Sequence, residues 1–240
     1  MILNQGYLIK RKATSRQVEH YTMRLINPKE LDLVMNLQKM VYDGLLNKDV
    51  LYCDTKRDIL TDLEQGAMII GVFNSSEQLI SYRYISFPST AVRNLGHDIR
   101  LDEVELEKVV HLETTLVHPD YRGNRLQSLT LNKAIELVEP MEMKHLLCTV
   151  SPYNLFSLHN IMTSGLKIKA LKRKYGTTDE SGMWRFILHK DLKEVVKCTP
   201  DIIKAIPMGD IRVQKKIIEE GYVGYHLNKE SQIIQYAYNC

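Results

Sequence analysis

One segment constrains the fold of this chain more than any other: residues 111–138 combine a strand, a short turn and an amphipathic helix. The strand half ends at Val117 and is rich in β-branched and apolar residues, which favour extended structure. Pro119 stops the strand because it has no N–H to donate to a neighbouring strand, and Gly123 marks the turn. Apolar residues then recur at helical spacing and mark one buried face: Leu126, Leu129, Ala134, Leu137 and Val138. Such a unit predicts an α/β class of fold.

The turn of this segment is suited to hold an anion. The first N–H groups of a helix have no partner within the helix and lie at the positive end of its dipole. A diphosphate fits such an end, and Arg122 and Arg125 add two positive charges there. Many α/β proteins have a similar turn without a ligand. The turn by itself therefore favours a phosphorylated ligand without requiring one.

The segment Val117-His-Pro-Asp-Tyr-Arg-Gly-Asn-Arg-Leu-Gln127 resembles the acetyl-CoA motif of the GCN5-related N-acetyltransferases, the GNAT superfamily. That motif has the form Arg/Gln-x-x-Gly-x-Gly/Ala after the fourth strand. Arg122 matches its first position, whereas Arg125 and Gln127 occupy its two small positions. Glycine there lets the backbone approach the pyrophosphate, so the departure predicts a looser fit. The resemblance implies that acetyl-CoA contacts Leu116, Val117, Arg122, Gly123, Asn124, Arg125, Leu126, Gln127 and Ser128.

A second block further along the chain is also similar to this family. Thr149-Val-Ser-Pro-Tyr-Asn-Leu-Phe-Ser157, followed by Gly165, matches the pattern strand-Asn-x-x-Ala/Ser-helix-Gly. The resemblance implies that Asn154 and Ser157 line the pantetheine and adenosine side of CoA. Asn154 by itself is also a common helix cap. The family often has an acid tyrosine seven residues after this asparagine; here that position is Ile161, and the substitutes are His159, Tyr153 or Tyr175.

Acetyl transfer to an amine needs a base, because only the neutral amine attacks the thioester. Glu113 is the candidate: it lies four residues before Val117, on a strand that otherwise consists of buried types. A carboxylate there is costly unless it is paired or functional. An ion pair with Arg83 or Arg185 explains it equally well. The resemblance also implies that backbone N–H groups near Leu116 and Val117 stabilise the developing oxyanion.

Two functions are therefore weighed. The first is an acetyl-CoA-dependent N-acetyltransferase that acts on a primary amine of a small molecule or peptide by direct attack in a ternary complex. The second is a non-catalytic acyl-CoA-binding or sensor module of the same fold. Glu113 and a long loop at 88–102, which could form a lid over the acceptor, favour the first. Arg125, Gln127 and Ile161 favour the second.

Composition excludes other classes of partner. The chain has 240 residues and a net charge of only +3, too small to indicate nucleic acid. No apolar run is long enough to span a bilayer, which predicts no membrane partner. The four cysteines are widely spaced and form no CxxC pair, so neither a metal site nor a disulfide framework is expected. The expected location is the cytoplasm, and a homodimer is an option that the sequence leaves open.

The order of the expected elements indicates a mixed, mostly antiparallel central sheet flanked by helices, with a C-terminal helix and hairpin added. Residues 1–18 are expected to be an arm or a short strand, 19–190 the acetyltransferase-like domain, and 191–240 an extension docked on it. That extension could cap the acceptor site or form a dimer contact. The expected strands are 19–26, 67–74, 79–87, 111–117, 144–150, 166–175, 183–189, 222–227 and 232–238, and the expected helices are 28–45, 54–66, 126–138, 153–165 and 210–221.

Overall fold

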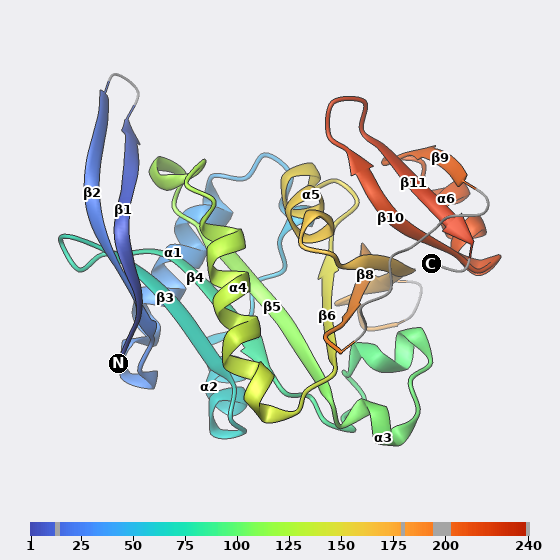
Figure 1. Cartoon of the computed structure of the whole chain (residues 1–240), viewed down its shortest axis with the longest axis horizontal. Coiled ribbons are helices and arrows are strands. Elements are labelled where there is room, and N and C mark those ends of the chain that lie inside the picture. The colour runs from blue at the N-terminus through green and yellow to red at the C-terminus, as the bar shows by residue number, and fades with distance from the viewer. Residues whose placement is uncertain (13–14, 179–180, 194–202, 239–240) are drawn as a thin grey trace. The chain divides into compact units, whose positions relative to one another are not determined.

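The computed structural model describes residues 1–12, 15–178, 181–193 and 203–238, which form two compact units (Figure 1). Unit 1 consists of Met1–Lys48, Cys53–Phe87 and Leu112–Met141. Unit 2 consists of Asp49–Tyr52, Pro88–His111 and Glu142–Cys240. Each unit combines helices with a mostly antiparallel sheet, which confirms the predicted fold class. None of the helices in the described ranges is both long and apolar enough to cross a bilayer.

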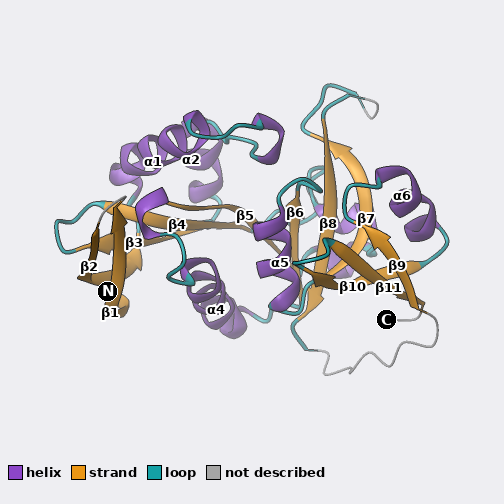
Figure 2. Cartoon of the chain, turned by 90° about the horizontal axis from the view of Figure 1, so that it is seen from above, coloured by secondary structure: helices purple, strands orange, loops and turns teal. Residues whose placement is uncertain are grey.

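The sheet of unit 1 is covered on both faces. Its strands, in spatial order, are β1 (Ile2–Lys12), β2 (Ser15–Leu25), β3 (Met68–Asn74), β4 (Leu79–Ser86) and the later part of β5 (Val109–Val117). Its helices are α1 (Leu31–Asp43), α2 (Lys56–Glu64) and α4 (Leu126–Val138). Figure 2 shows α1 and α2 on one face of this sheet and α4 on the other. Every residue of β4 is buried, as expected for a strand between two helical layers.

The N-terminal segment is a strand and not a loose arm. β1 pairs with β2 from Ile2 opposite Arg24 to Lys12 opposite Ser15, so the two strands form a long antiparallel hairpin. β2 begins at Ser15, four residues before the predicted start. Most side chains near the turn of this hairpin are exposed and polar, so alternation of apolar residues gave no signal there.

The sheet of unit 2 begins with residues 109–111 of β5, which pair in parallel with β6. The strands that follow, in spatial order, are β6 (His145–Val150), β8 (Met183–Asp191), β7 (Lys167–Lys174), β10 (Tyr222–Asn228), β11 (Ile233–Tyr238) and β9 (Ile203–Pro207), all joined by antiparallel pairing. The helices of this unit are α3 (Glu103–Leu106), α5 (Leu155–Thr163) and α6 (Ile211–Glu219).

The C-terminal extension continues this sheet. The expected hairpin, β10 and β11, gains a third strand because β9 pairs with β11, and Gly224 of β10 pairs with Ile168 of β7. Gln214 of α6 is fully buried and donates to the carbonyl oxygens of Pro207 and Met208 at 2.9 and 2.6 Å. These bonds tie α6 to the end of β9. Residues 194–202, with Cys198, and the terminal Cys240 lie outside the described residues.

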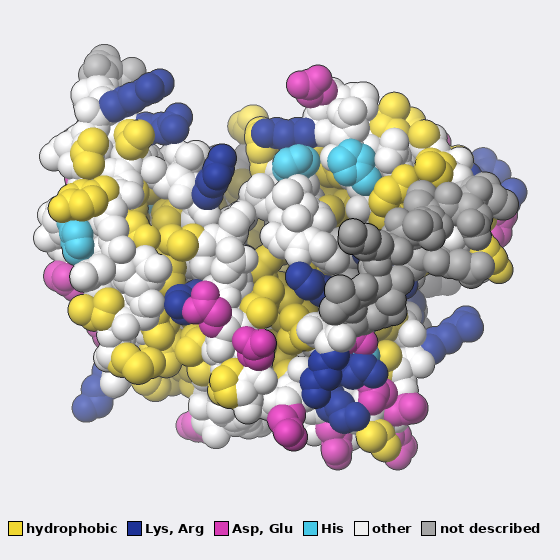
Figure 3. Space-filling model, in the orientation of Figure 1, with side chains coloured by type: hydrophobic (Ala, Val, Ile, Leu, Met, Phe, Trp, Pro, Cys, Tyr) yellow, Lys and Arg dark blue, Asp and Glu magenta, His cyan; other side chains and the backbone are white. Residues whose placement is uncertain are grey.

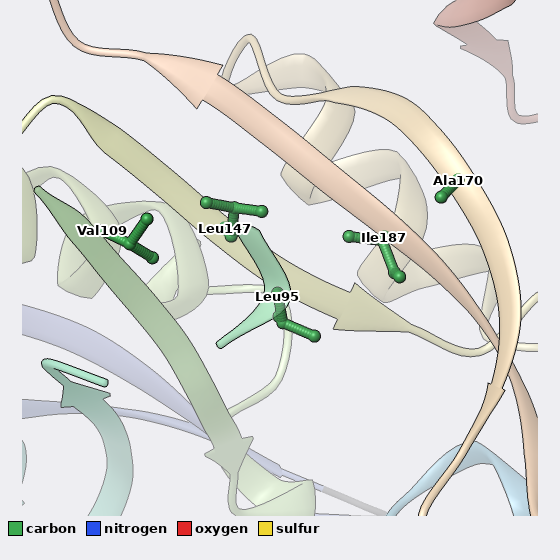
Figure 4. Close-up of a cluster of buried hydrophobic side chains, with 5 residues drawn as sticks. All are labelled: Leu95, Val109, Leu147, Ala170 and Ile187. Carbon is green, nitrogen blue, oxygen red and sulfur yellow. The ribbon is translucent and has the colours of Figure 1, made fainter. Parts of the chain in front are cut away.

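The segment 88–102, which the sequence offers as a possible lid over the acceptor, is anchored in unit 2. Leu95 packs with Val109, Leu147, Ala170 and Ile187 in the core of unit 2 (Figure 4). The buried side chain of Asn94 donates to the carbonyl oxygen of Leu106 at 3.1 Å and accepts from the Gly96 N–H at 2.8 Å. These contacts hold the segment in place, and the sequence does not predict them.

Candidate active site

The turn between β5 and α4 has an unusual backbone. Gly123 has a φ of +84°, and Arg125, the N-cap residue of α4, has a φ of 57°. A left-handed backbone is easy for glycine and costs other residues about 1 to 2 kcal/mol. Arg125 stands at the first glycine position of the GNAT motif. The chain therefore keeps a backbone typical of glycine at this position although it carries an arginine.

Two side chains fix this turn to the N-terminal hairpin. The Asn124 side chain exchanges two hydrogen bonds with the backbone of Ile9, both 2.8 Å long. The buried Tyr121 donates its hydroxyl to Glu19 at 2.8 Å and accepts from the amide of Asn74 at 2.9 Å. The side chain of Asn124 thus holds the loop in place, and its predicted contact with acetyl-CoA would have to come from its backbone.

The amino end of α4 is uncapped and positively charged. No side chain caps it, and its first turn holds no acidic residue. Arg122 and Arg125 are exposed, and the guanidinium of Arg11 lies 3.1 Å from where a Cβ on Gly123 would be. Among the residues that the structure describes, none of these three arginines has an ion-pair partner. Figure 3 shows basic side chains gathered toward the upper end of the β1–β2 hairpin.

The other predicted cofactor residues of this segment frame the turn. Leu116 and Leu126 are buried, whereas Val117 and Ser128 are half-buried. The carbonyl oxygen of Leu116 accepts from Ser81 at 2.8 Å. The carbonyl oxygen of Gln127 accepts from the buried Arg83 at 3.1 Å. The turn and the start of α4 therefore rest on β4, and their contact with acetyl-CoA stays a prediction.

Two carboxylates lie beside the centre of β5. Glu113, the candidate base, is half-buried and accepts from the Ser86 hydroxyl at 2.6 Å. Asp54, from the loop before α2, accepts from the Thr114 hydroxyl at 2.7 Å. Burial raises the pKa of Asp54 to about 6, and the neighbouring charge of Glu113 acts in the same direction. The predicted alternative partner Arg83 donates to Thr130 and to the backbone of Gln127, and Arg185 donates to the backbone of Trp184.

The second predicted cofactor block lies in unit 2. Asn154 caps α5, since its side chain accepts from the Ser157 N–H at 3.1 Å. Ile161, at the usual position of the acid, is buried. Of its three proposed substitutes, Tyr175 is held most closely: it stacks on Tyr52 with ring centroids 4.0 Å apart, and its hydroxyl bonds to Thr149 at 2.7 Å.

Comparison of the fold with solved structures finds acetyltransferases. An N-acetyltransferase from Staphylococcus aureus aligns with a TM-score of 0.54 and 13% identity, over 72% of this chain and 99% of the other. A ribosomal-protein alanine N-acetyltransferase from Escherichia coli aligns with a TM-score of 0.53 and 11% identity, over 74% and 97%. A phosphinothricin acetyltransferase of the GNAT superfamily from Sinorhizobium meliloti, solved with acetyl-CoA, aligns with a TM-score of 0.53 and 15% identity, over 76% and 95%. The predicted resemblance is thus confirmed at the level of the fold.

No protein-family model and no curated protein matches the sequence itself. At identities of 11 to 15%, the structural matches establish the acetyltransferase fold and not the activity. The activity has to be argued from the site.

Sequence reasoning missed two contributors to this site. Arg11 lies in the segment that the sequence predicts to be an arm or a short strand, and nothing local in the sequence connects it with Gly123. Asp54 was taken as the first residue of a helix, but Thr55 is the N-cap and pairs with Asp58 in a capping box. The Thr-x-x-Asp pattern was a usable signal, because it leaves Asp54 with no capping role.

Proposed function

We propose that this chain is an acetyl-CoA-dependent N-acetyltransferase, which transfers an acetyl group to a primary amine of a small molecule or peptide in a ternary complex. The observation that carries the proposal is the uncapped amino end of α4, with Gly123 and Arg125 in left-handed conformations and three arginines without ion-pair partners in the described part of the chain. This arrangement follows a central strand in a fold shared with acetyltransferases.

The residues fit the phosphates of acetyl-CoA. The N–H groups of the first turn of α4 offer donors to the pyrophosphate, and Arg122 and Arg125 offer charge. Arg11 extends the same positive surface from β1. That Asn154 and Ser157 also contact the cofactor stays a prediction from the sequence motif.

Acetyl-CoA supplies the activated acetyl group, and the protein has to orient the amine and take up its proton. The proposed oxyanion donors are N–H groups of β5 near Leu116 and Val117. Two carboxylates beside β5, Glu113 and Asp54, are in place to serve as the base. Holding both reactants together supplies a further part of the rate. The cytoplasmic location and the homodimer stay predictions from the sequence.

Calorimetric titration of acetyl-CoA into the purified chain tests the proposal, followed by release of CoA from acetyl-CoA in the presence of primary amines. The expected result is micromolar binding and turnover with at least one class of amine. Binding without turnover with any amine would favour the acyl-CoA sensor. The buried Ile161, at the position where the acid is usually found, supports that alternative. Absence of binding would leave only the fold.

A further inference from the structure

We propose that Asp54, and not Glu113, is the group that accepts the proton of the attacking amine, an inference that rests on the proposed function. Asp54 lies in the loop that connects α1 with α2, and it meets the centre of β5 through Thr114. Sixty residues separate the two positions in the sequence. The carboxylate is therefore brought to the central strand by the fold alone.

The loop presents Asp54 in a defined orientation. Its carbonyl oxygen accepts from the Gln38 side chain of α1 at 2.9 Å, while its carboxylate accepts from Thr114 at 2.7 Å. The buried hydroxyl of Tyr82 reaches the other side of Gln38 at 3.3 Å. Asp54 is thus held between α1 and β5 at both its backbone and its side chain, and the cap of α2 is the next residue, Thr55.

The burial of the strand changes at this point. β5 is buried from Val109 to Leu112, but Glu113, Thr114 and Thr115 are all only half-buried. The hydroxyl of Thr115 is itself buried and has no hydrogen-bond partner among the described residues. A buried hydroxyl without a partner costs free energy, which a polar ligand or a water molecule can recover. The centre of β5 is therefore partly exposed and carries an unfilled polar contact.

The two carboxylates differ in the element that carries them, because Glu113 belongs to β5, whereas Asp54 belongs to a loop whose backbone is bonded to α1. Each carboxylate accepts one hydroxyl, Glu113 from Ser86 at 2.6 Å and Asp54 from Thr114 at 2.7 Å. Asp54 carries the charge that burial disfavours, which raises its pKa to about 6. The neighbouring acidic groups are Glu113 of β5, Asp58 of α2, Cys53 of the loop, and Tyr82 and Tyr84 of β4. Such a pKa gives a carboxylate that is ionised at neutral pH and basic enough to accept a proton.

The proposed step begins with the protonated amine beside Asp54. An ammonium N–H bond breaks, the proton moves to a carboxylate oxygen of Asp54, and the nitrogen keeps the electron pair. That pair forms the bond to the acetyl carbon, and the C–S bond breaks with its electrons on sulfur. The second amine proton ends on the thiolate, which leaves as CoA thiol. Asp54 then releases its proton to water.

The test measures kcat/KM against pH for a panel of spermidine, phenylethylamine, lysine and an alanyl peptide, with acetyl-CoA as donor. For the wild type we expect activity to rise with pH through about 6, because Asp54 must be ionised to act. Asp54→Asn should lower kcat by roughly 100-fold or more, the size expected for a general base. Its Kd for acetyl-CoA should stay within about twofold, since the phosphate loop is unchanged.

Two further variants should move the acid limb of the kcat/KM profile against pH in opposite directions. Thr114→Val removes the hydrogen bond that lowers the pKa of Asp54, so the limb should move to higher pH, and Thr114→Ser should restore it. Glu113→Gln removes a like charge, so the limb should move to lower pH. Asp43→Asn, a change at an exposed carboxylate paired with Lys39 on α1, is the matched control and should leave the profile unchanged.

The outcomes separate this inference from the proposed function. If Glu113→Gln abolishes turnover while Asp54→Asn keeps it, Glu113 is the base and the inference about Asp54 is wrong, although the enzyme is confirmed. If the wild type shows no turnover with any amine, the proposed function fails and this inference fails with it. Thermal unfolding of Asp54→Asn shows whether a loss of kcat comes from a loss of fold.

Discussion

The chain contains two strand-to-helix junctions, β5 to α4 in unit 1 and β6 to α5 in unit 2. The two junctions differ in how the helix begins. At the first junction the helix begins at Arg125 without a side-chain cap. At the second, Asn154 caps the helix through the Ser157 N–H. An uncapped helix end keeps its N–H donors for a ligand, whereas a capped end has already used one. The two junctions therefore have different capacities for an anion, although sequence motifs mark both as cofactor-binding.

The largest expected effect is on the affinity for acetyl-CoA when positive charge is removed from the first junction. The double change Arg122→Ala and Arg125→Ala removes two contacts to phosphate, each worth about 1.5 to 3 kcal/mol. The Kd for acetyl-CoA should rise roughly 100-fold or more, and its dependence on salt should become weaker. Calorimetry at two salt concentrations measures both. The control is the double change Arg57→Ala and Arg212→Ala, which removes two exposed arginines on α2 and α6. An unchanged Kd after loss of Arg122 and Arg125 would exclude the junction as the phosphate site.

The second effect concerns the backbone of the turn. Gly123→Ala forces a residue with a Cβ into a φ of +84°, which should cost about 1 to 2 kcal/mol of the free energy of unfolding. Because the turn holds the donors, the Kd for acetyl-CoA should also rise about tenfold. Gly66→Ala is matched in φ, at +93°, and lies after α2 with no atom within 4 Å of the added Cβ. It should lose similar stability in urea unfolding and keep its Kd, and a parallel loss of binding would show that the effect is general.

The third effect tests the capped junction. Asn154→Ala should lower the free energy of unfolding by about 1 kcal/mol, because the Ser157 N–H loses its acceptor. Asn154→Ser supplies a hydroxyl acceptor and should restore most of it. Denaturant unfolding measures both variants. If acetyl-CoA affinity falls in both while stability recovers in the serine variant, Asn154 contacts the cofactor in addition to capping the helix.

The smallest effect is expected where the chain departs from the GNAT motif that it resembles. Arg125→Gly relieves the left-handed strain but adds backbone entropy to the unfolded chain, so a net gain of about 0.5 kcal/mol is expected. Thermal or urea unfolding measures it. A loss of stability would mean that the contacts of the arginine outweigh the strain.

Much of the first junction could be predicted from the sequence because its signals are local. Apolar periodicity predicts the strand and the helix, Pro119 marks the end of the strand, and Gly123 marks the turn. The bounds of β5 and α4 therefore agree with the prediction to within a few residues. The same holds for α5 and its asparagine cap. The positions of Arg122 and Asn154 relative to their helices follow from the same local spacing.

What local signals could not give are pairings between distant parts of the chain. The bond between Asn124 and Ile9 spans 115 residues, and that between Asp54 and Thr114 spans 60. No period or turn residue encodes such contacts. The sequence by itself therefore determined most of the strands and helices, and it singled out one turn as a candidate anion site. Only the tertiary structure decided that a hairpin supports that turn and that a second carboxylate stands beside the central strand, because packing and desolvation act between residues far apart in the chain.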